Sequence, residues 1–259
     1  MRQALIGSTG FVGGNLLSQQ AFSDLYASAN IAEIRGQAFD RIVCAGVSAV
    51  KWWANKNPEE DLAKIDNLVS HLSHVQADVF TLISTIDIFK TPNGVTEDDV
   101  PETENLHAYG SNRLYFENFI RGRFPKVHIV RLPALFGDNL RKNALYDLMN
   151  GNQTTNINPA GSFQWYPVDW LSDDLAVVEK NDLPLVHFAT EPLLMQDIID
   201  RFFPTAEVGQ ATKDAPSYDF HTKYADRFNS ATPYMARRDS IFAAMKHTID
   251  RATGTAGAQ

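Results

Sequence analysis

Short apolar runs alternate with helix-forming stretches along the first half of the chain. The predicted strands cover residues 4–6, 24–28, 41–45, 79–84 and 127–132, and the predicted helices cover 11–19, 58–75 and 107–123. Strands that alternate with helices favour a parallel sheet whose connections cross over its faces. The helix from residue 58 has clear start signals, because Asn57 can cap it, Pro58 suits its first turn and the acids at 59–61 complement its dipole.

The second half has a weaker pattern. We expect a strand near 185–188 and helices near 141–149, 173–179, 194–203 and 239–251, while the polar segment 90–105 is predicted to be a surface loop. No repeat or linker divides the chain. The expected fold is therefore α/β, a single Rossmann-type domain over residues 1–251 with a doubly wound parallel sheet. A small C-terminal substrate lobe is expected mainly from 138–184 and 204–251, and 252–259 are expected to form a flexible tail.

Charge and composition narrow the class of partner. The chain carries 31 acidic and 23 basic residues, a net charge of −8, so a nucleic-acid partner is not expected. Cys44, the only cysteine, lies in an apolar run and is predicted to be a buried thiol in a reducing compartment. No apolar stretch reaches the roughly 20 residues that cross a bilayer, and a strand begins at once, so we expect a cytoplasmic protein without a membrane partner. The seven histidines show no metal-ligand spacing, and no metal site is predicted.

A glycine-rich turn links the first strand to the first helix. Gly7 can make the tight turn, Gly10 lets the backbone approach a pyrophosphate, and Gly13 lets the helix pack on the sheet. The start of the helix then offers N–H groups to phosphates. We predict a dinucleotide site that includes Gly7, Thr9, Gly10, Phe11, Val12 and Gly13. The alternative is a tight turn with only a structural role.

The end of the second strand bears on which dinucleotide binds. A carboxylate there would hold the ribose 2′-OH of NAD, but the chain has Ser28 and Asn30 and no acid. These side chains can bond a 2′-phosphate without repelling it, and Arg35 follows nearby. The sequence therefore favours NADP over NAD. The alternative for Asn30 is that it only caps a short helix starting at Ile31.

Tyr109 and Arg113 are four residues apart on a predicted helix and so share a face. Thr85 follows a strand at the carboxyl edge of the sheet, where ligands bind. The loop between Thr85 and Tyr109 can bring the hydroxyl and the phenol together. Asp87 and His107 flank this region as auxiliary acid–base groups or, more often for such residues, as turn and capping residues.

Taken in order, four segments resemble the extended short-chain dehydrogenase/reductase family, the nucleotide-sugar epimerase and dehydratase group. They are Gly7-x-x-Gly10-x-x-Gly13, Ser84-Thr85-x-x-x-Phe89, Tyr109-Gly110-x-x-Arg113-x-x-x-Glu117 and Arg131-Leu132-Pro133-Ala134-Leu135-Phe136-Gly137. The resemblance covers roughly residues 3–200, and Trp165 to Asp169 looks like a later substrate-side segment of the family.

The resemblance implies roles for matching residues. Thr85 would hydrogen-bond the substrate oxygen, and Tyr109 would move a proton to or from it while hydride passes to or from the nicotinamide. Leu132 and Pro133 would meet the carboxamide, and Ala45 and Gly46 complete the predicted cofactor site. The family has a lysine that lowers the tyrosine pKa and bonds the nicotinamide ribose, whereas this chain has Arg113. Arginine keeps the charge in a bulkier fork, so Arg113 is expected to lower the Tyr109 pKa and to donate to the ribose, and Tyr109 and Arg113 are included in the predicted cofactor site.

The resemblance therefore implies an NAD(P)-dependent oxidoreductase or epimerase acting on a sugar, with a nucleotide-linked sugar expected, and reduction of a keto-sugar is favoured over epimerisation. The alternative is a non-catalytic NAD(P)-binding sensor or scaffold whose site has drifted, which the Lys-to-Arg departure favours. Relatives often dimerise through the tyrosine helix, so a homodimer is possible, with apolar surface from Leu114, Phe116, Phe119 and Ile120. Trp52 and Trp53 are expected to pack in the core or the lobe, with lining of the cofactor or substrate cleft as the alternative. Arg237 and Arg238 are expected at a solvated helix start, with contact to a diphosphate as the alternative.

Overall fold

Unit 1 of the chain is built around a six-stranded parallel sheet. The computed structural model describes residues 1–254 and divides them into two compact units, of which unit 1 comprises Met1–Thr91, Glu97–Leu132 and Leu171–His187. The strand order is β2-β1-β3-β4-β5-β9, and every pair is parallel. The strands are β1 (Gln3–Ile6), β2 (Asp24–Tyr26), β3 (Ala38–Cys44), β4 (Gln76–Thr85), β5 (Val127–Leu132) and β9 (Leu185–His187). The predicted Rossmann-type sheet is confirmed.

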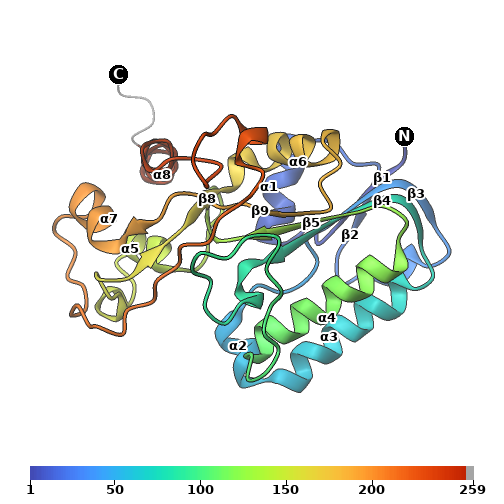
Figure 1. The fold of residues 1–259 in the computed structure, drawn as a ribbon, viewed down its shortest axis with the longest axis horizontal. Helices are drawn as coiled ribbons and strands as arrows, with labels where there is room; N and C mark the ends of the chain where they lie inside the picture. Colours follow the sequence, from blue (N-terminus) through green and yellow to red (C-terminus); the bar gives the residue numbers. More distant parts are fainter. Residues whose placement is uncertain (255–259) are drawn as a thin grey trace. The chain divides into compact units, whose positions relative to one another are not determined.

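Helices cover both faces of this sheet (Figure 1). α3 (Pro58–Leu72) and α4 (Ala108–Arg123) pack together on one face, and α1 (Phe11–Gln19) and α6 (Leu171–Lys180) on the other. On α3, Ile65, Leu68 and Leu72 recur at helical spacing and are buried in a core with Phe80 of β4. The apolar positions that predict these helices thus also determine which helix face packs on the sheet.

Some local predictions need correction. Asn57 is the residue before α3, but its side chain does not cap that helix; its amide donates to the Trp53 carbonyl at 2.9 Å. The reason is a helix that sequence reasoning missed, α2 (Lys51–Lys56), whose last turn offers this carbonyl one turn before Asn57. The segment 90–105 has no helix or strand, as predicted.

Unit 2 comprises Pro92–Thr96, Pro133–Trp170 and the described residues from Phe188 onward. It contains β6 (Ala134–Phe136) parallel to β8 (Trp165–Pro167), and β7 (Ser162–Phe163) antiparallel to β10 (Leu193–Leu194), none of which was predicted. Its helices are α5 (Ala144–Asn150), α7 (Met195–Phe202) and α8 (Arg238–Thr253). Trp165, Leu193 and Phe242 are among the side chains of its own core.

The predicted boundaries of the lobe stay a prediction; in the structure α6 and β9 belong to unit 1. Residues 252 and 253, expected in the tail, continue α8, Gly254 is the C-cap residue of that helix, and the remaining residues of the expected tail, 255–259, lie outside the described residues. Short 3-10 turns occur at Ile31–Ile34, Ile86–Ile88, Thr154–Asn156, Val168–Trp170 and Ala225–Phe228.

Candidate active site

The glycine turn lies where the sheet connections change direction, between β1 and its neighbours β2 and β3. Gly7 has φ +89°, and a Cβ there would come within 2.4 Å of the Ala45 carbonyl oxygen. A Cβ at Gly13 would come within 2.2 Å of the Gly7 carbonyl oxygen, and one at Gly46 within 2.8 Å of Ile6. These positions need glycine because two strand ends and the start of α1 meet without room for side chains.

Gly10 is the N-cap residue of α1, and having no side chain it makes no capping hydrogen bond there. The predicted cofactor residues Thr9 and Gly10 are exposed, and Phe11 and Val12 are half-buried on the first turn. A pyrophosphate fits such a place, since the first N–H groups of a helix lack partners within the helix.

The loop after β2 is shaped by Asn30. Its side-chain oxygen accepts from the Ala27 amide at 2.7 Å, and its amide donates to the Leu25 carbonyl at 3.0 Å. It precedes the turn at Ile31–Ile34 without a side-chain cap bond, so the capping alternative is wrong. Ser28 is exposed in this loop. Arg35 is turned toward α3, where it donates to His71 at 2.8 Å and to Ser70 at 3.2 Å.

Thr85 and Tyr109, far apart in sequence, come together at the carboxyl edge of the sheet. Thr85 is the last residue of β4, in register with Leu132 at the end of β5, and its hydroxyl lies close enough to the Tyr109 phenol to lower the pKa of that phenol. Tyr109 lies on the first turn of α4, where His107 caps the helix by accepting from the Gly110 amide at 3.0 Å. The capping interpretation of His107 is thus confirmed.

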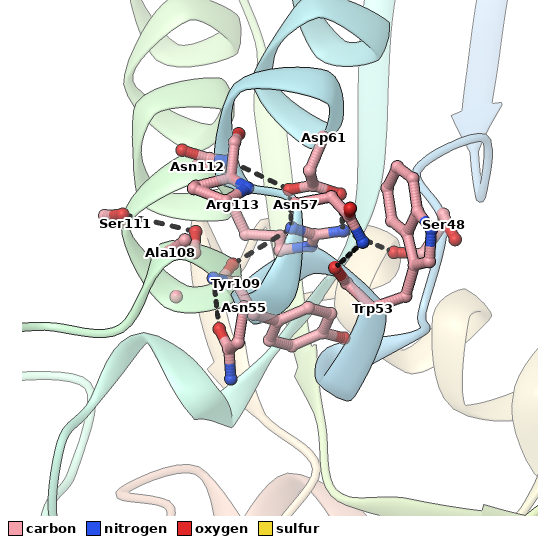
Figure 2. A network of polar contacts seen from close by, with 12 residues as sticks. Ser48, Trp53, Asn55, Asn57, Asp61, Ala108, Tyr109, Ser111, Asn112 and Arg113 are labelled. Atoms are coloured by element: carbon pink, nitrogen blue, oxygen red, sulfur yellow. Dashed lines mark hydrogen bonds and ion pairs between the residues drawn. The ribbon is translucent and has the colours of Figure 1, made fainter.

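Close approach of α4 to this edge depends on Gly110. A Cβ there would stand 2.4 Å from the Asp87 carbonyl oxygen. The Tyr109 amide also donates to the Asn55 side chain of α2 at 2.9 Å, which anchors the helix start (Figure 2). Sequence reasoning gave Gly110 and Asn55 no role, although glycine directly after the tyrosine was a usable signal.

Nearly every N–H donor of the Arg113 guanidinium is hydrogen-bonded to another group of the protein. Its guanidinium forms a two-pronged ion pair with Asp61 of α3, donating through NH1 to Oδ2 and through NH2 to Oδ1 at 2.9 Å. NH2 also donates to the Ser48 carbonyl at 2.6 Å, and NH1 to the Tyr109 carbonyl at 3.2 Å. Figure 2 shows the guanidinium between Asp61 and Ser48 with the Tyr109 ring beside it, and its central carbon is 3.9 Å from the ring centroid.

The pKa values at this centre follow from burial and charge. Burial raises the pKa of the Tyr109 phenol above its ordinary value, and the Arg113 charge and the nearby Thr85 hydroxyl oppose that rise without cancelling it. Burial also pushes the pKa of Asp61 upward, but hydrogen bonds from Arg113 and Asn112 and the Arg113 charge outweigh it, so the pKa is lowered. Tyr109 therefore keeps its proton at neutral pH while Asp61 is ionised.

A second ion pair lies next to Thr85. Lys51 of α2 contacts Asp87 at 2.8 Å, and the Asp87 amide donates to the Thr85 hydroxyl at 3.1 Å. Burial, followed by the Lys51 charge, lowers the pKa of His107. Asp87 therefore acts here as an ion-pair and turn residue, and His107 is neutral at neutral pH.

A buried cluster supports the same strand ends. Glu117 of α4 accepts from Ser84 at 2.6 Å and from two nitrogens of Arg131 at 3.1 and 2.7 Å. Arg131 is also 3.2 Å from the His187 ring nitrogen on β9. Glu117 thus connects α4 to β4 immediately before Thr85 and to β5 immediately before Leu132.

Several other residues considered in the sequence analysis lie outside this centre. Cys44 is buried, which raises its pKa to about 12. Trp52 is 69% exposed, so its predicted burial is wrong, while Trp53 stacks under Lys64. Arg238 pairs with Asp197 at the start of α8. Phe116 and Ile120 are buried in the core of unit 1 with Phe119 packed against it, so the homodimer stays a prediction.

No group of three or more His, Cys, Asp or Glu side chains within residues 1–254 could hold a metal ion. No helix in the same range is long and apolar enough to span a membrane.

Known proteins share this fold at low sequence identity. No protein-family model and no curated protein matches the sequence. Among solved structures, a dTDP-4-dehydrorhamnose reductase from Clostridium acetobutylicum is similar over 98% of this chain and 100% of its own, with TM-score 0.74 and 16% identity. UDP-glucose 4-epimerase from Thermotoga maritima is similar over 98% and 99%, with TM-score 0.75 and 12% identity.

A third similar structure is UDP-glucuronic acid 4-epimerase from Bacillus cereus in complex with a UDP-sugar and NAD, with 96% and 98% coverage, TM-score 0.72 and 14% identity. At these identities the likeness shows the fold. It agrees with the fold that the four sequence segments implied.

Proposed function

We propose that this protein is an NAD(P)-dependent oxidoreductase that reduces the carbonyl of a nucleotide-linked keto-sugar. The observation that carries the proposal is the placement of the Thr85 hydroxyl next to the Tyr109 phenol at the carboxyl edge of a sheet that also holds a glycine turn built for a dinucleotide. The similar structures are a reductase and epimerases of nucleotide-linked sugars, which supports the substrate class.

The residues present fit a nicotinamide dinucleotide. Glycines at 7, 10 and 13 leave the space that side chains would fill, and the start of α1 offers N–H groups to the pyrophosphate. Ser28 and Asn30 lie where the adenine ribose is expected, and Ala45 and Gly46 lie against Gly7. Leu132 is the last residue of β5 and Pro133 follows it, at the predicted nicotinamide contact. When bound, the cofactor supplies or accepts hydride.

The chain's own residues would manage the proton. The Thr85 hydroxyl donates a hydrogen bond to the substrate oxygen and orients it toward Tyr109. Because the pKa of the Tyr109 phenol is raised, the phenol is protonated at neutral pH and can give that proton to a carbonyl oxygen as it becomes a hydroxyl. The protonated state favours reduction over oxidation, and it also favours reduction over epimerisation, which begins with an oxidation.

The absence of an acid after β2 and the exposed Ser28 support NADP as the cofactor. NAD remains the alternative, since a similar structure contains it. Titrating each oxidised and reduced cofactor while following the fluorescence of the four tryptophans separates the two.

Turnover tests the proposal. Purified protein is mixed with NADPH or NADH and a panel of dTDP- and UDP-linked 4-keto-sugars, and loss of the reduced-nicotinamide absorbance is followed. Tyr109→Phe should lower kcat by at least about 100-fold with cofactor affinity unchanged. Tyr115→Phe is the matched control, because Tyr115 lies on the same helix with its hydroxyl bonded to Asp66 at the surface. Full turnover by Tyr109→Phe refutes the scheme.

The second candidate is a non-catalytic NAD(P)-binding sensor. The observation in its favour is Arg113, whose guanidinium is occupied by Asp61 and two carbonyls. This reading expects tight cofactor binding with no hydride transfer to any keto-sugar, and cofactor affinity that is the same in the parent and in Tyr109→Phe.

A further inference from the structure

We infer that Asp61 is a positioning residue of this site: it holds the Arg113 guanidinium against the Tyr109 ring, so that Arg113 serves the phenol and not a cofactor ribose. The inference rests on the proposed function and deepens it, because it assigns a role to a residue of α3 that the resemblance does not mark. It differs from the ribose contact that the resemblance implies for Arg113.

The first support is the completeness of the Asp61 site. Both oxygens of the carboxylate accept from Arg113, and Oδ2 also accepts from the Asn112 amide at 2.9 Å. The two charged side chains are 2% and 5% exposed. A buried carboxylate is tolerated only when it is paired and hydrogen-bonded, and here three N–H donors from α4 meet that need.

The second support is the number of donors that Arg113 has left. Its four terminal N–H groups point at Asp61, Ser48 and Tyr109 acceptors, and the residue is 4% exposed. The remaining donor, Nε, is buried and has no hydrogen-bond partner within residues 1–254. The terminal N–H groups could reach a ribose hydroxyl only by breaking one of these contacts, and the one donor without a partner, Nε, is buried.

The third support is that the arrangement requires arginine. The planar fork binds a carboxylate with two nitrogens, reaches the Ser48 carbonyl after β3 and still lies flat on an aromatic ring. A lysine ammonium is a single point and cannot do all three. Arg113 and Asp61 therefore form one unit, and the change from lysine makes physical sense only with the acid on α3.

The charged groups around the Tyr109 phenol determine how its pKa should change when the Asp61 charge is removed. Tyr109 is faced by Arg113 on its own helix, Asp61 on α3, Thr85 at the end of β4, Asp87 in the turn after β4 and the ring of His107. Lys51 of α2 is paired with Asp87. Asp61 offsets the Arg113 charge. Removing the Asp61 charge leaves Arg113 uncompensated and should lower the pKa of Tyr109.

The experiment compares Asp61→Asn with Asp66→Asn, an exposed acid on the same helix. The ionisation of Tyr109 is isolated from that of the other seven tyrosines as the ultraviolet difference titration between each protein and its Tyr109→Phe partner. Asp61→Asn should shift this titration down by about one pH unit or more, and lower kcat about tenfold because the ring is less firmly held. Cofactor Kd should stay within about twofold, and Asp66→Asn should change nothing.

Three results overturn the inference. Two concern Asp61→Asn: an unshifted Tyr109 titration, or an unchanged kcat and pH profile. The third is a rise of cofactor Kd of more than about tenfold in Arg113→Met, which would mean that Arg113 does contact the cofactor ribose. If Asp61→Asn does not fold, the double variant Asp61→Asn/Arg113→Met leaves no unpaired buried charge and is measured instead. It should bind cofactor with parental Kd and show lowered kcat; loss of cofactor binding by the folded double variant also counts against the inference.

The same data separate this inference from the proposed function, because the titration and the binding need no turnover. A shifted titration in a protein that reduces no sugar sustains the role of Asp61 and defeats the proposed function. Sugar reduction with an unshifted titration supports the proposed function and refutes the role of Asp61.

Discussion

Replacing Gly110 by alanine tests whether the fit of α4 against the end of β4 places Tyr109 beside Thr85. The added Cβ would stand 2.4 Å from the Asp87 carbonyl oxygen, whereas real Cβ contacts are essentially never below 3.0 Å, so the helix start must retreat by about 0.6 Å. The obstacle is backbone and cannot rotate away. The crowding should cost about 1–3 kcal/mol of stability, and each kcal/mol lowers the unfolding midpoint of a chain of this size by about 2–4 °C.

The retreat should also separate the phenol from Thr85, since both sit at this contact. A misplacement of this order should lower kcat at least about tenfold. Cofactor Kd should be unchanged, because the glycine turn lies at the ends of β1 and β3. Both effects are measured on purified protein, by thermal unfolding and by the keto-sugar assay.

Gly122→Ala is the matched control, the same substitution on the same helix. Gly122 is exposed, and a Cβ there meets nothing within 4 Å. Alanine should therefore stabilise the helix by up to about 1 kcal/mol. If Gly110→Ala unfolds at or above the midpoint of the parent, the steric reasoning is refuted.

Three further predictions follow from single side chains. Cys44 is buried with its pKa raised to about 12, so a thiol reagent should label it only at the rate of unfolding; rapid labelling of the native protein would contradict its burial. The pKa of Asp61 is lowered in the folded state, so its ion pair stabilises the protein fully above the unfolded pKa of about 4. This stability is lost as the pH falls through the pKa of Asp61 in the folded state. Asp61→Asn should therefore lower the urea midpoint strongly at pH 7 and much less at about pH 3. Ser28→Asp should weaken NADP binding at least about tenfold and spare NAD, measured by tryptophan quenching; equal effects on both would exclude Ser28 from the 2′-phosphate site.

Much of unit 1 was predictable because its signals are local. The spacing of Ile65, Leu68 and Leu72 specifies a buried helix face, and Pro58 with the acids after it marks where that helix begins. Strands β6, β7, β8 and β10 of unit 2 were missed because they are two or three residues long, too short for alternation to be recognised. Asn57 was assigned a cap that it does not make, because the preceding helix offers its side chain a competing carbonyl.

Some features of the candidate site could also be predicted from local sequence, and others could not. Glycine at 7, 10 and 13 is a requirement of backbone geometry, so the turn could be read from residue type and spacing alone, and so could the shared face of Tyr109 and Arg113. Sequence order also placed Thr85 at a strand end. These features depend on neighbours within one or two turns of chain.

Only the tertiary structure decided what Arg113 binds. Its charge and its bulk follow from residue type, but the acid that pairs with it lies 52 residues earlier, at a position that looked like an ordinary dipole partner at the start of α3. Which donors and acceptors meet depends on how α3, α4 and the loop after β3 cross, and this crossing is fixed by the packing of their apolar faces and not by the polar residues themselves.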